Sequence, residues 1–156
     1  MLRFADTLRL ALLLAVAALS GCNRYLAREV HVEATEVETY GSAGADVTLQ
    51  AVNRGGRALR LEASEFTLAY DGGEVLRAQL MDTVTLLPRW EGAVRLRYRL
   101  RIPDRAALHA VRQKLARGQT QRFSVTFSLR LRVGDATKKI GRRRMPLSDF
   151  LNTFGL

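Results

Sequence analysis

The stretch GAVRLRYRLRI, from Gly92 to Ile102, alternates apolar residues with arginines. Successive side chains of a β-strand point to opposite faces, so this period of two predicts a strand with one buried and one charged face. The inward residues are Val94, Leu96, Tyr98, Leu100 and Ile102, and the outward residues are Arg95, Arg97, Arg99 and Arg101. This is the most regular strand in the chain.

A second long alternation predicts a strand from Arg122 to Val133, with six apolar residues facing inward. Gly134-Asp135 then turns the chain, and Lys138 to Met145 returns as its hairpin partner. Between the two long strands, Asp104 caps a predicted helix that Gly118 closes. The apolar residues of this helix, Leu108, Val111 and Leu115, recur at helical spacing.

The N-terminal half carries shorter alternations at residues 29–38, 46–53, 57–62, 65–70, 74–81 and 84–87. Turns separate them at 41–44, at 53–56, where we expect a positive φ, and at Asp71-Gly72-Gly73, a strong hairpin signal. About eight strands and one helix predict an all-β fold, a mostly antiparallel β-sandwich over residues 29–151. Residues 146–151 form a short terminal turn or helix, and 152–156 a C-terminal tail.

The N-terminus has Arg3 and Arg9, an apolar run from Leu10 to Leu19, and small residues before Cys22, with Asp6 as an atypical acid. About ten apolar residues are too few to span a hydrocarbon core of roughly 30 Å. The segment Leu19-Ser20-Gly21-Cys22 resembles the bacterial lipoprotein signal. That resemblance implies cleavage before Cys22, a diacylglyceryl thioether on its sulfur and an acylated amine.

We therefore expect residues 1–21 to be a signal peptide and residues 22–28 a lipidated tether that holds the protein at a membrane. An ordinary cleaved signal with a leftover cysteine is the alternative. Asn23 replaces the Asp that tends to retain lipoproteins in the inner membrane, which favours the outer membrane, facing the periplasm. Cys22 is the only cysteine, so neither a disulfide within the chain nor a second thiol is available.

Charge is distributed unevenly along the chain, whose net charge is +10. Residues 22–88 hold ten acidic and six basic side chains, whereas residues 89–156 hold seventeen basic and four acidic ones. Such an asymmetry indicates either an anionic partner or a fold in which acidic strands lie beside basic ones. Four surplus acids cannot neutralise thirteen surplus bases, so part of the positive surface must stay exposed.

From about Val30 to Leu151 the pattern is similar to the LEA type 2 domain (LEA14-like, water-stress and hypersensitive-response) in its bacterial lipoprotein form. The likeness rests on Leu49-Gln50-Ala51-Val52-Asn53, the hairpin from Phe66 to Leu76, the strand that Gly92 opens, the helix ending in Gly118 and the closing hairpin before Pro146. Arg54-Gly55-Gly56 departs from the pair that often follows the family's Asn. The resemblance implies an immunoglobulin-like or fibronectin-III-like sandwich and a non-enzymatic role in desiccation or envelope stress.

The arginine row is the candidate binding surface. Alternate residues of a strand are about 6.6–7 Å apart, where two cations in water repel by only about 0.6 kcal/mol, so the row needs no partner. Cross-strand glutamates can neutralise it, or it can contact phospholipid, lipopolysaccharide phosphate or an acidic protein. The candidate contact residues are Arg95, Arg97, Arg99, Arg101, Arg130 and Arg132. Lys138, Lys139, Arg142, Arg143 and Arg144 add to the exposed charge.

No catalytic or cofactor site is expected. His31 and His109 are the only histidines and lack a third ligand, which argues against a metal site. No serine lies in a nucleophile-elbow context, and Glu33, Glu36 and Glu38 are expected to form a solvated strand face. Export argues against nucleic acid, and Phe123 and Phe127 fit a core better than a base-stacking platform.

The predicted function is a non-enzymatic, lipid-anchored envelope module that protects or organises the envelope. The alternative is an acyl-chain or lipid binding and transfer protein, or a lipoprotein-assembly factor, with an apolar groove between the sheets.

Overall fold

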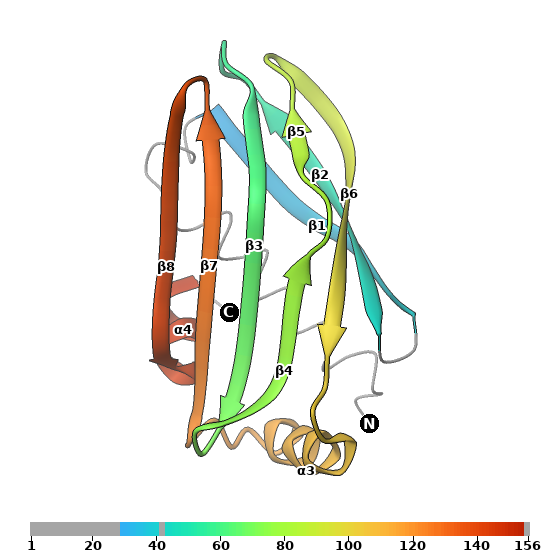
Figure 1. The fold of residues 1–156 in the computed structure, drawn as a ribbon, viewed down its shortest axis with the longest axis vertical. Helices are drawn as coiled ribbons and strands as arrows, with labels where there is room; N and C mark the ends of the chain where they lie inside the picture. Colours follow the sequence, from blue (N-terminus) through green and yellow to red (C-terminus); the bar gives the residue numbers. More distant parts are fainter. Residues whose placement is uncertain (1–28, 41–42, 155–156) are drawn as a thin grey trace.

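The computed structural model describes residues 29–40 and 43–154, which form one antiparallel sheet and two helices (Figure 1). The strands are β1 (Val30–Tyr40), β2 (Gly44–Asn53), β3 (Leu59–Tyr70), β4 (Gly73–Leu80), β5 (Val84–Leu86), β6 (Trp90–Arg101), β7 (Phe123–Val133) and β8 (Ala136–Pro146). The helices are α3 (Arg105–Ala116) and α4 (Leu147–Phe154). Cys22, the expected signal peptide 1–21 and the tether 22–28 lie outside the described residues, as do residues 41–42 and 155–156.

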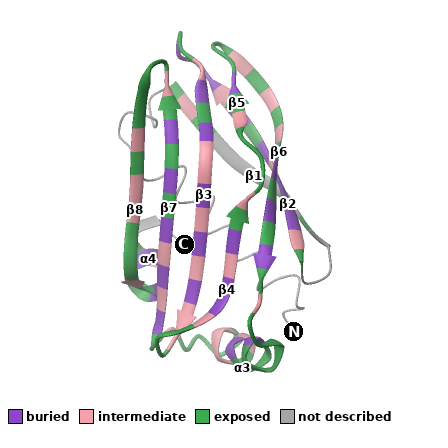
Figure 2. Ribbon diagram, in the orientation of Figure 1, coloured by how far each residue is buried: buried purple, intermediate pink, exposed green. Residues whose placement is uncertain are grey.

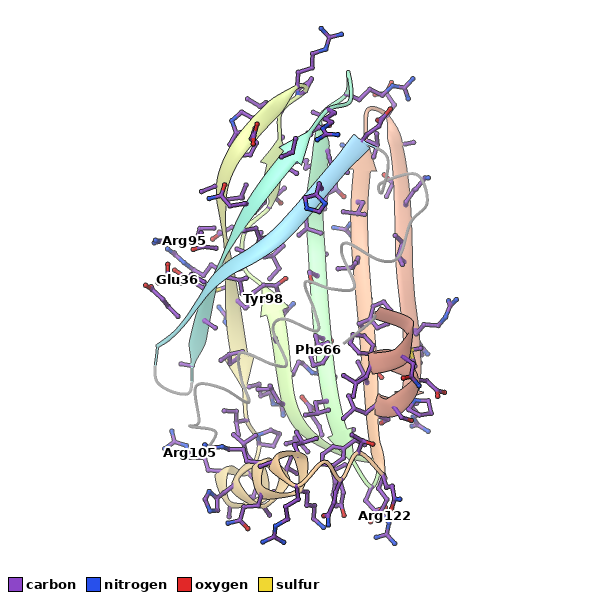
Figure 3. The ribbon with its side chains drawn as sticks, turned by 180° about the vertical axis from the view of Figure 1, so that it is seen from behind. Glu36, Phe66, Arg95, Tyr98, Arg105 and Arg122 are labelled. Carbon is purple, nitrogen blue, oxygen red and sulfur yellow. The ribbon has the colours of Figure 1, made fainter. Side chains whose placement is uncertain are left out.

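The eight strands form one continuous sheet in the order β1-β2-β6-β4-β3-β7-β8, with β5 paired to β3. The sheet curls, so that β1 crosses behind β3 in the view of Figure 1 and in front of it in the view from behind (Figure 3). The buried residues form one core cluster. The expected all-β, sandwich-like antiparallel fold with a short helix is confirmed. Its two layers are the two halves of one curled sheet, joined where four residues of β4 pair with β6.

Strand β6 has the two faces that its alternation predicts. Leu96, Tyr98 and Leu100 are buried, whereas the four arginines are exposed (Figure 2). Strand β7 repeats the pattern, with every second residue from Phe123 to Leu131 in the core. Burial of these alternating side chains supplies the main driving force for closing the sheet.

The two predicted strands 57–62 and 65–70 are one strand, β3, and the prediction of two was wrong. A bulge between Leu61 and Ala63 inserts an extra residue opposite β7. The extra residue reverses the inside-outside alternation, so that Leu59 and Leu61 before it and Phe66 after it all face the core. The pattern therefore breaks in the sequence although the strand continues.

The expected positive φ at residues 53–56 is also wrong. The Asn53 side chain shapes this turn instead, because its Oδ1 accepts a hydrogen bond from Gly55 N at 3.0 Å. Positive φ values occur at the β3–β4 hairpin, where Asp71 (53°) and Gly72 (82°) form the tight turn that their sequence predicts.

Helix α3 covers one end of the curled sheet (Figure 1). Asp104 Oδ1 accepts hydrogen bonds from Ala106 N (2.9 Å) and Ala107 N (3.2 Å), which confirms the predicted cap, and Gly118 follows with a φ of 71°. Helix α4 places Phe150 against Phe66 and Phe127, with ring centroids 6.1 and 5.6 Å apart. It extends to Phe154, three residues beyond the expected end of the domain.

Among the described residues, neither helix has the length and apolar character needed to cross a bilayer.

Candidate functional site

The arginine row lies on the outer face of β6, between β2 and β4. Strand register places Arg95 opposite Thr48, Arg97 opposite Asp46 and Arg99 opposite Gly44. Arg101 lies opposite Arg77 of β4. The row therefore runs along the long axis of the molecule and ends beside α3.

Asp46 forms ion pairs with Arg95 and Arg97, the first half of the row. Its carboxylate lies 3.8 Å from Arg95 Nη1 and 3.7 Å from Arg97 Nε, and its side chain is only 3% exposed. One strand farther out, β1 places Glu36 opposite Thr48 and Glu38 opposite Asp46. Glu36 and Arg95 project from the same side of the sheet (Figure 3). This part of the face therefore carries both signs of charge.

Among the residues that the structure describes, no such carboxylate lies beside the second half of the row. Within residues 29–40 and 43–154, no acid forms an ion pair with Arg99 or Arg101. The neighbouring Arg77 is held by Glu74, whose Oε1 lies 2.9 Å from Arg77 Nε. Arg99 and Arg101 are thus the exposed cations of the row that remain available to an external anion.

Arg130 and Arg132 of β7 share one acid on the adjacent β3. Glu62 Oε2 lies 3.0 Å from Arg130 Nε, and Oε1 lies 3.5 Å from Arg132 Nε. The structure does not bring this pair together with the β6 row, because β4 and β3 lie between β6 and β7 in the sheet. The six candidate contact residues therefore form two separate groups.

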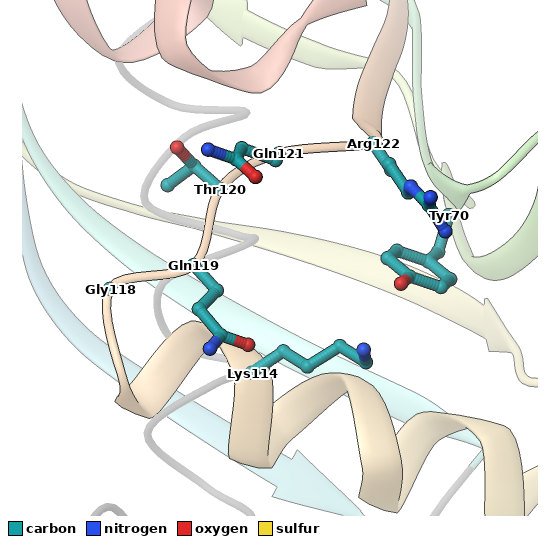
Figure 4. Close-up of a pocket in the computed structure, with 7 residues that line it drawn as sticks. All are labelled: Tyr70, Lys114, Gly118, Gln119, Thr120, Gln121 and Arg122. Atoms are coloured by element: carbon teal, nitrogen blue, oxygen red, sulfur yellow. The ribbon is translucent and has the colours of Figure 1, made fainter.

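A cleft of about 520 Å³ opens at the end of the sheet that α3 covers (Figure 4). We call it the helix-end cleft; it is lined by Tyr70, Lys114, Gly118, Gln119, Thr120, Gln121 and Arg122. Tyr70 packs against Phe123, with ring centroids 4.8 Å apart and ring planes tilted by 52°, and Lys114 Nζ lies 5.0 Å from the centre of the Tyr70 ring. The cleft thus places the phenol of Tyr70 beside the ammonium group of Lys114 from α3.

Both cations of the helix-end cleft act on Tyr70. Hydrogen bonding from Lys114 lowers the pKa of the phenol, its partial desolvation acts in the opposite sense, and the charges of Lys114 and Arg122 lower it further. Arg122 adopts a φ of 65°, and its guanidinium lies 3.6 Å from the Asp71 carboxylate. These residues come from β3, α3 and the segment before β7, so no local motif in the sequence predicts the cleft.

A second cleft, of about 360 Å³, is lined by Val52, Asn53, Arg54, Arg89, Trp90 and Glu91. Polar side chains predominate in both clefts, so neither is the apolar groove that acyl-chain binding requires. Acyl-chain transfer stays a prediction.

The two histidines lie on different elements and are both exposed. His31 is on β1, and His109 Nε2 lies 3.3 Å from the Gln113 amide on α3. No group of three potential metal ligands occurs in the described part of the chain.

No protein-family model matches the sequence, and no curated protein matches it. Among solved structures, a protein from Archaeoglobus fulgidus is similar over 72% of this chain and 89% of its own, with 15% identity and a TM-score of 0.45. The GAE domain of GGA2p from Saccharomyces cerevisiae is similar over 73% of this chain and 86% of its own, with 10% identity and a TM-score of 0.34.

Proposed function

We propose that this protein is a non-enzymatic, lipid-anchored module of the bacterial cell envelope that contacts anionic surfaces through β6. The observation that carries the proposal is the exposure of Arg99 and Arg101 without a carboxylate partner in the described chain. Arg95 and Arg97 contribute less, because contact with an external anion competes with Asp46.

The free energy that two arginines can contribute fits a weak membrane contact supported by a lipid anchor. A basic side chain near an anionic membrane contributes about 1 kcal/mol, so Arg99 and Arg101 together supply about 2 kcal/mol. That is too little for stable attachment by itself. Acyl chains on Cys22 would hold the domain at the bilayer and raise the effective concentration of the arginines there. A protective or organising role under desiccation or envelope stress follows from the LEA type 2 resemblance.

The test measures binding of the full chain, carrying Cys22→Ser to remove the anchor, to vesicles that contain anionic phospholipid. We expect Arg99→Gln with Arg101→Gln to weaken binding about tenfold to thirtyfold at low salt. The matched control, Arg95→Gln with Arg97→Gln, removes the same charge and is expected to weaken binding less than threefold. Binding should fall as salt screens the charges.

Two results would contradict the proposed contact. One is the absence of salt-sensitive binding by the chain with all four arginines. The other is an equal loss in the two double variants, which would show that total charge, and not Arg99 and Arg101, determines binding.

A further inference from the structure

The helix-end cleft has the composition of an anion site, although none of its residues was expected from the sequence to bind a ligand. It is distinct from the β6 row: its cations lie on α3 and before β7, at the end of the sheet and not on its outer face (Figure 4). We infer that the helix-end cleft binds the phosphate group of a small polar ligand. The inference is independent of lipidation at Cys22 and of the β6 contact.

Charge and donors at the cleft favour phosphate. Lys114 and Arg122 present positive charge from two sides, and the Tyr70 hydroxyl lies in the field of both. A phosphate group offers several strong acceptor oxygens and a charge near −2, and it forms charge-assisted hydrogen bonds with ammonium and guanidinium groups. The same two cations lower the pKa of Tyr70, as expected where the electrostatic field stabilises an anion.

The size and lining of the cleft indicate what else the ligand carries. About 520 Å³ lies within the range of small-molecule sites and exceeds the space that one phosphate fills. The remaining lining side chains, Gln119, Thr120 and Gln121, offer amide and hydroxyl groups (Figure 4). Such a lining fits a hydroxylated, sugar-like body better than an acyl chain.

Asp71 competes with an incoming phosphate for the guanidinium of Arg122. Its carboxylate lies 3.6 Å from Arg122 Nη1, and both side chains are more than 60% exposed. An exposed ion pair of this kind is worth only about 0.2–1 kcal/mol, so an incoming phosphate can displace it. Removing the Asp71 charge should therefore strengthen binding, which is opposite to the usual effect of a surface substitution.

The cleft lies at the opposite end of the sheet from the start of β1, the strand that follows the tether (Figure 1). We expect the ligand to come from solution. The phosphate of a lipid headgroup is the alternative ligand. The experiment below distinguishes a soluble phosphorylated molecule from a lipid.

The test titrates the full chain, carrying Cys22→Ser, with inorganic phosphate and with glycerol 3-phosphate at constant ionic strength, with chloride as the reference. Backbone NMR shifts of residues 118–122 report occupancy. We expect saturable changes there, with tighter binding of glycerol 3-phosphate than of phosphate. A bound anion should also raise the pKa of Tyr70, because it opposes formation of the phenolate.

Single substitutions distinguish phosphate binding at a defined site from non-specific attraction to positive charge. Lys114→Gln and Arg122→Gln should each weaken binding about tenfold, and Asp71→Asn should strengthen it about twofold to fivefold. Arg117→Gln is the matched control, because it removes one charge at the same end of α3 without lining the cleft. Tyr70→Phe keeps the ring on Phe123 and should weaken binding only modestly.

The inference is overturned if phosphate causes no saturable shifts at millimolar concentration, or if Arg117→Gln weakens binding as much as Lys114→Gln does. Binding to vesicles of phosphatidylglycerol that requires Lys114 and Arg122, without binding of free glycerol 3-phosphate, would also overturn the small-ligand assignment. None of these outcomes depends on whether Arg99 and Arg101 contact a membrane.

Discussion

Asn53 connects three parts of the chain through one buried side chain. Its Nδ2 donates to the carbonyl oxygens of Arg57 (2.9 Å), Leu86 (3.3 Å) and Leu87 (3.1 Å), and its Oδ1 accepts from Gly55 N. The residue is 2% exposed. The β2–β3 turn and the end of β5 are therefore held together by one buried amide side chain.

Asn53→Ala is expected to destabilise the protein by about 2–3 kcal/mol, because it removes four hydrogen bonds and leaves the buried Leu86 carbonyl and Gly55 N–H without these partners. Chemical denaturation measures the loss. Gln50→Ala, at an exposed position on the same strand, should change stability by less than about 0.5 kcal/mol. Equal effects of the two substitutions would show that the Asn53 hydrogen bonds contribute nothing specific.

Tyr98 provides a pH-dependent test of the core. Its side chain is fully buried, its hydroxyl lies 3.1 Å from Ser64 Oγ, and burial raises the pKa of Tyr98 to about 12. A raised pKa means that the unfolded chain loses this proton first. The associated stability is fully present below pH 10 and is lost as the pH rises toward 12.

We expect the wild-type protein to lose about 3 kcal/mol of unfolding free energy from this group between pH 10 and pH 12. Tyr98→Phe should cost about 1 kcal/mol at pH 7 but should lack this loss. Urea denaturation of both proteins across that range measures the difference, and comparison of the two removes the contribution of lysine titration. Parallel pH profiles would refute the assignment.

At the scale of single elements, the pairing of β8 with β7 depends on a glycine in β8. Gly141 lies opposite Ser128 on β7, and a Cβ at this position would lie 2.7 Å from the Phe127 carbonyl oxygen. Backbone atoms cannot move aside as a flexible side chain does. Close approach of β7 and β8 therefore requires glycine at this position.

Gly141→Ala should destabilise the protein by about 1–3 kcal/mol and increase amide hydrogen exchange along β8. Gly56→Ala is the matched control, because a Cβ there meets nothing within 4 Å and no positive φ is required. That substitution should leave stability within about 0.5 kcal/mol of the wild type. Unchanged exchange in β8 of Gly141→Ala would show that the strands separate without cost.

At the scale of the whole molecule, the charge asymmetry of the sequence becomes a local arrangement in the sheet. Asp46 of β2 lies beside Arg95 and Arg97, and Glu62 of β3 lies beside Arg130 and Arg132. The acidic half of the chain thus interleaves with the basic half. The expectation that acidic strands lie beside basic ones therefore holds for these ion pairs. An anionic partner for Arg99 and Arg101, which have no acid among the described residues, stays a prediction.

Attachment to the envelope is expected to depend on Cys22. Cys22→Ser should move the protein from the membrane fraction to the soluble fraction and abolish incorporation of labelled fatty acid. Arg99→Gln with Arg101→Gln should leave the protein in the membrane fraction, because acyl chains contribute far more attachment than two cations. A wild-type protein with an unmodified sulfur in the soluble fraction would refute the anchor.

The sequence by itself determined the fold class, the long strands β6 and β7, the Asp104 cap and the Asp71-Gly72 hairpin. These features depend on local rules: a period of two, a side chain that caps a helix, and residues that tolerate positive φ. For the same reason the exposed arginine face of β6 could be predicted residue by residue.

Only the tertiary structure decided which charges meet and where a cleft forms. Strand β6 pairs with β2, whose position along the chain is about fifty residues earlier, and this pairing alone brings Asp46 to Arg95 and Arg97. The helix-end cleft combines Tyr70, Lys114 and Arg122 from three separate segments. Such contacts depend on sheet order and curl, which burial of the whole core determines and no short stretch of sequence encodes.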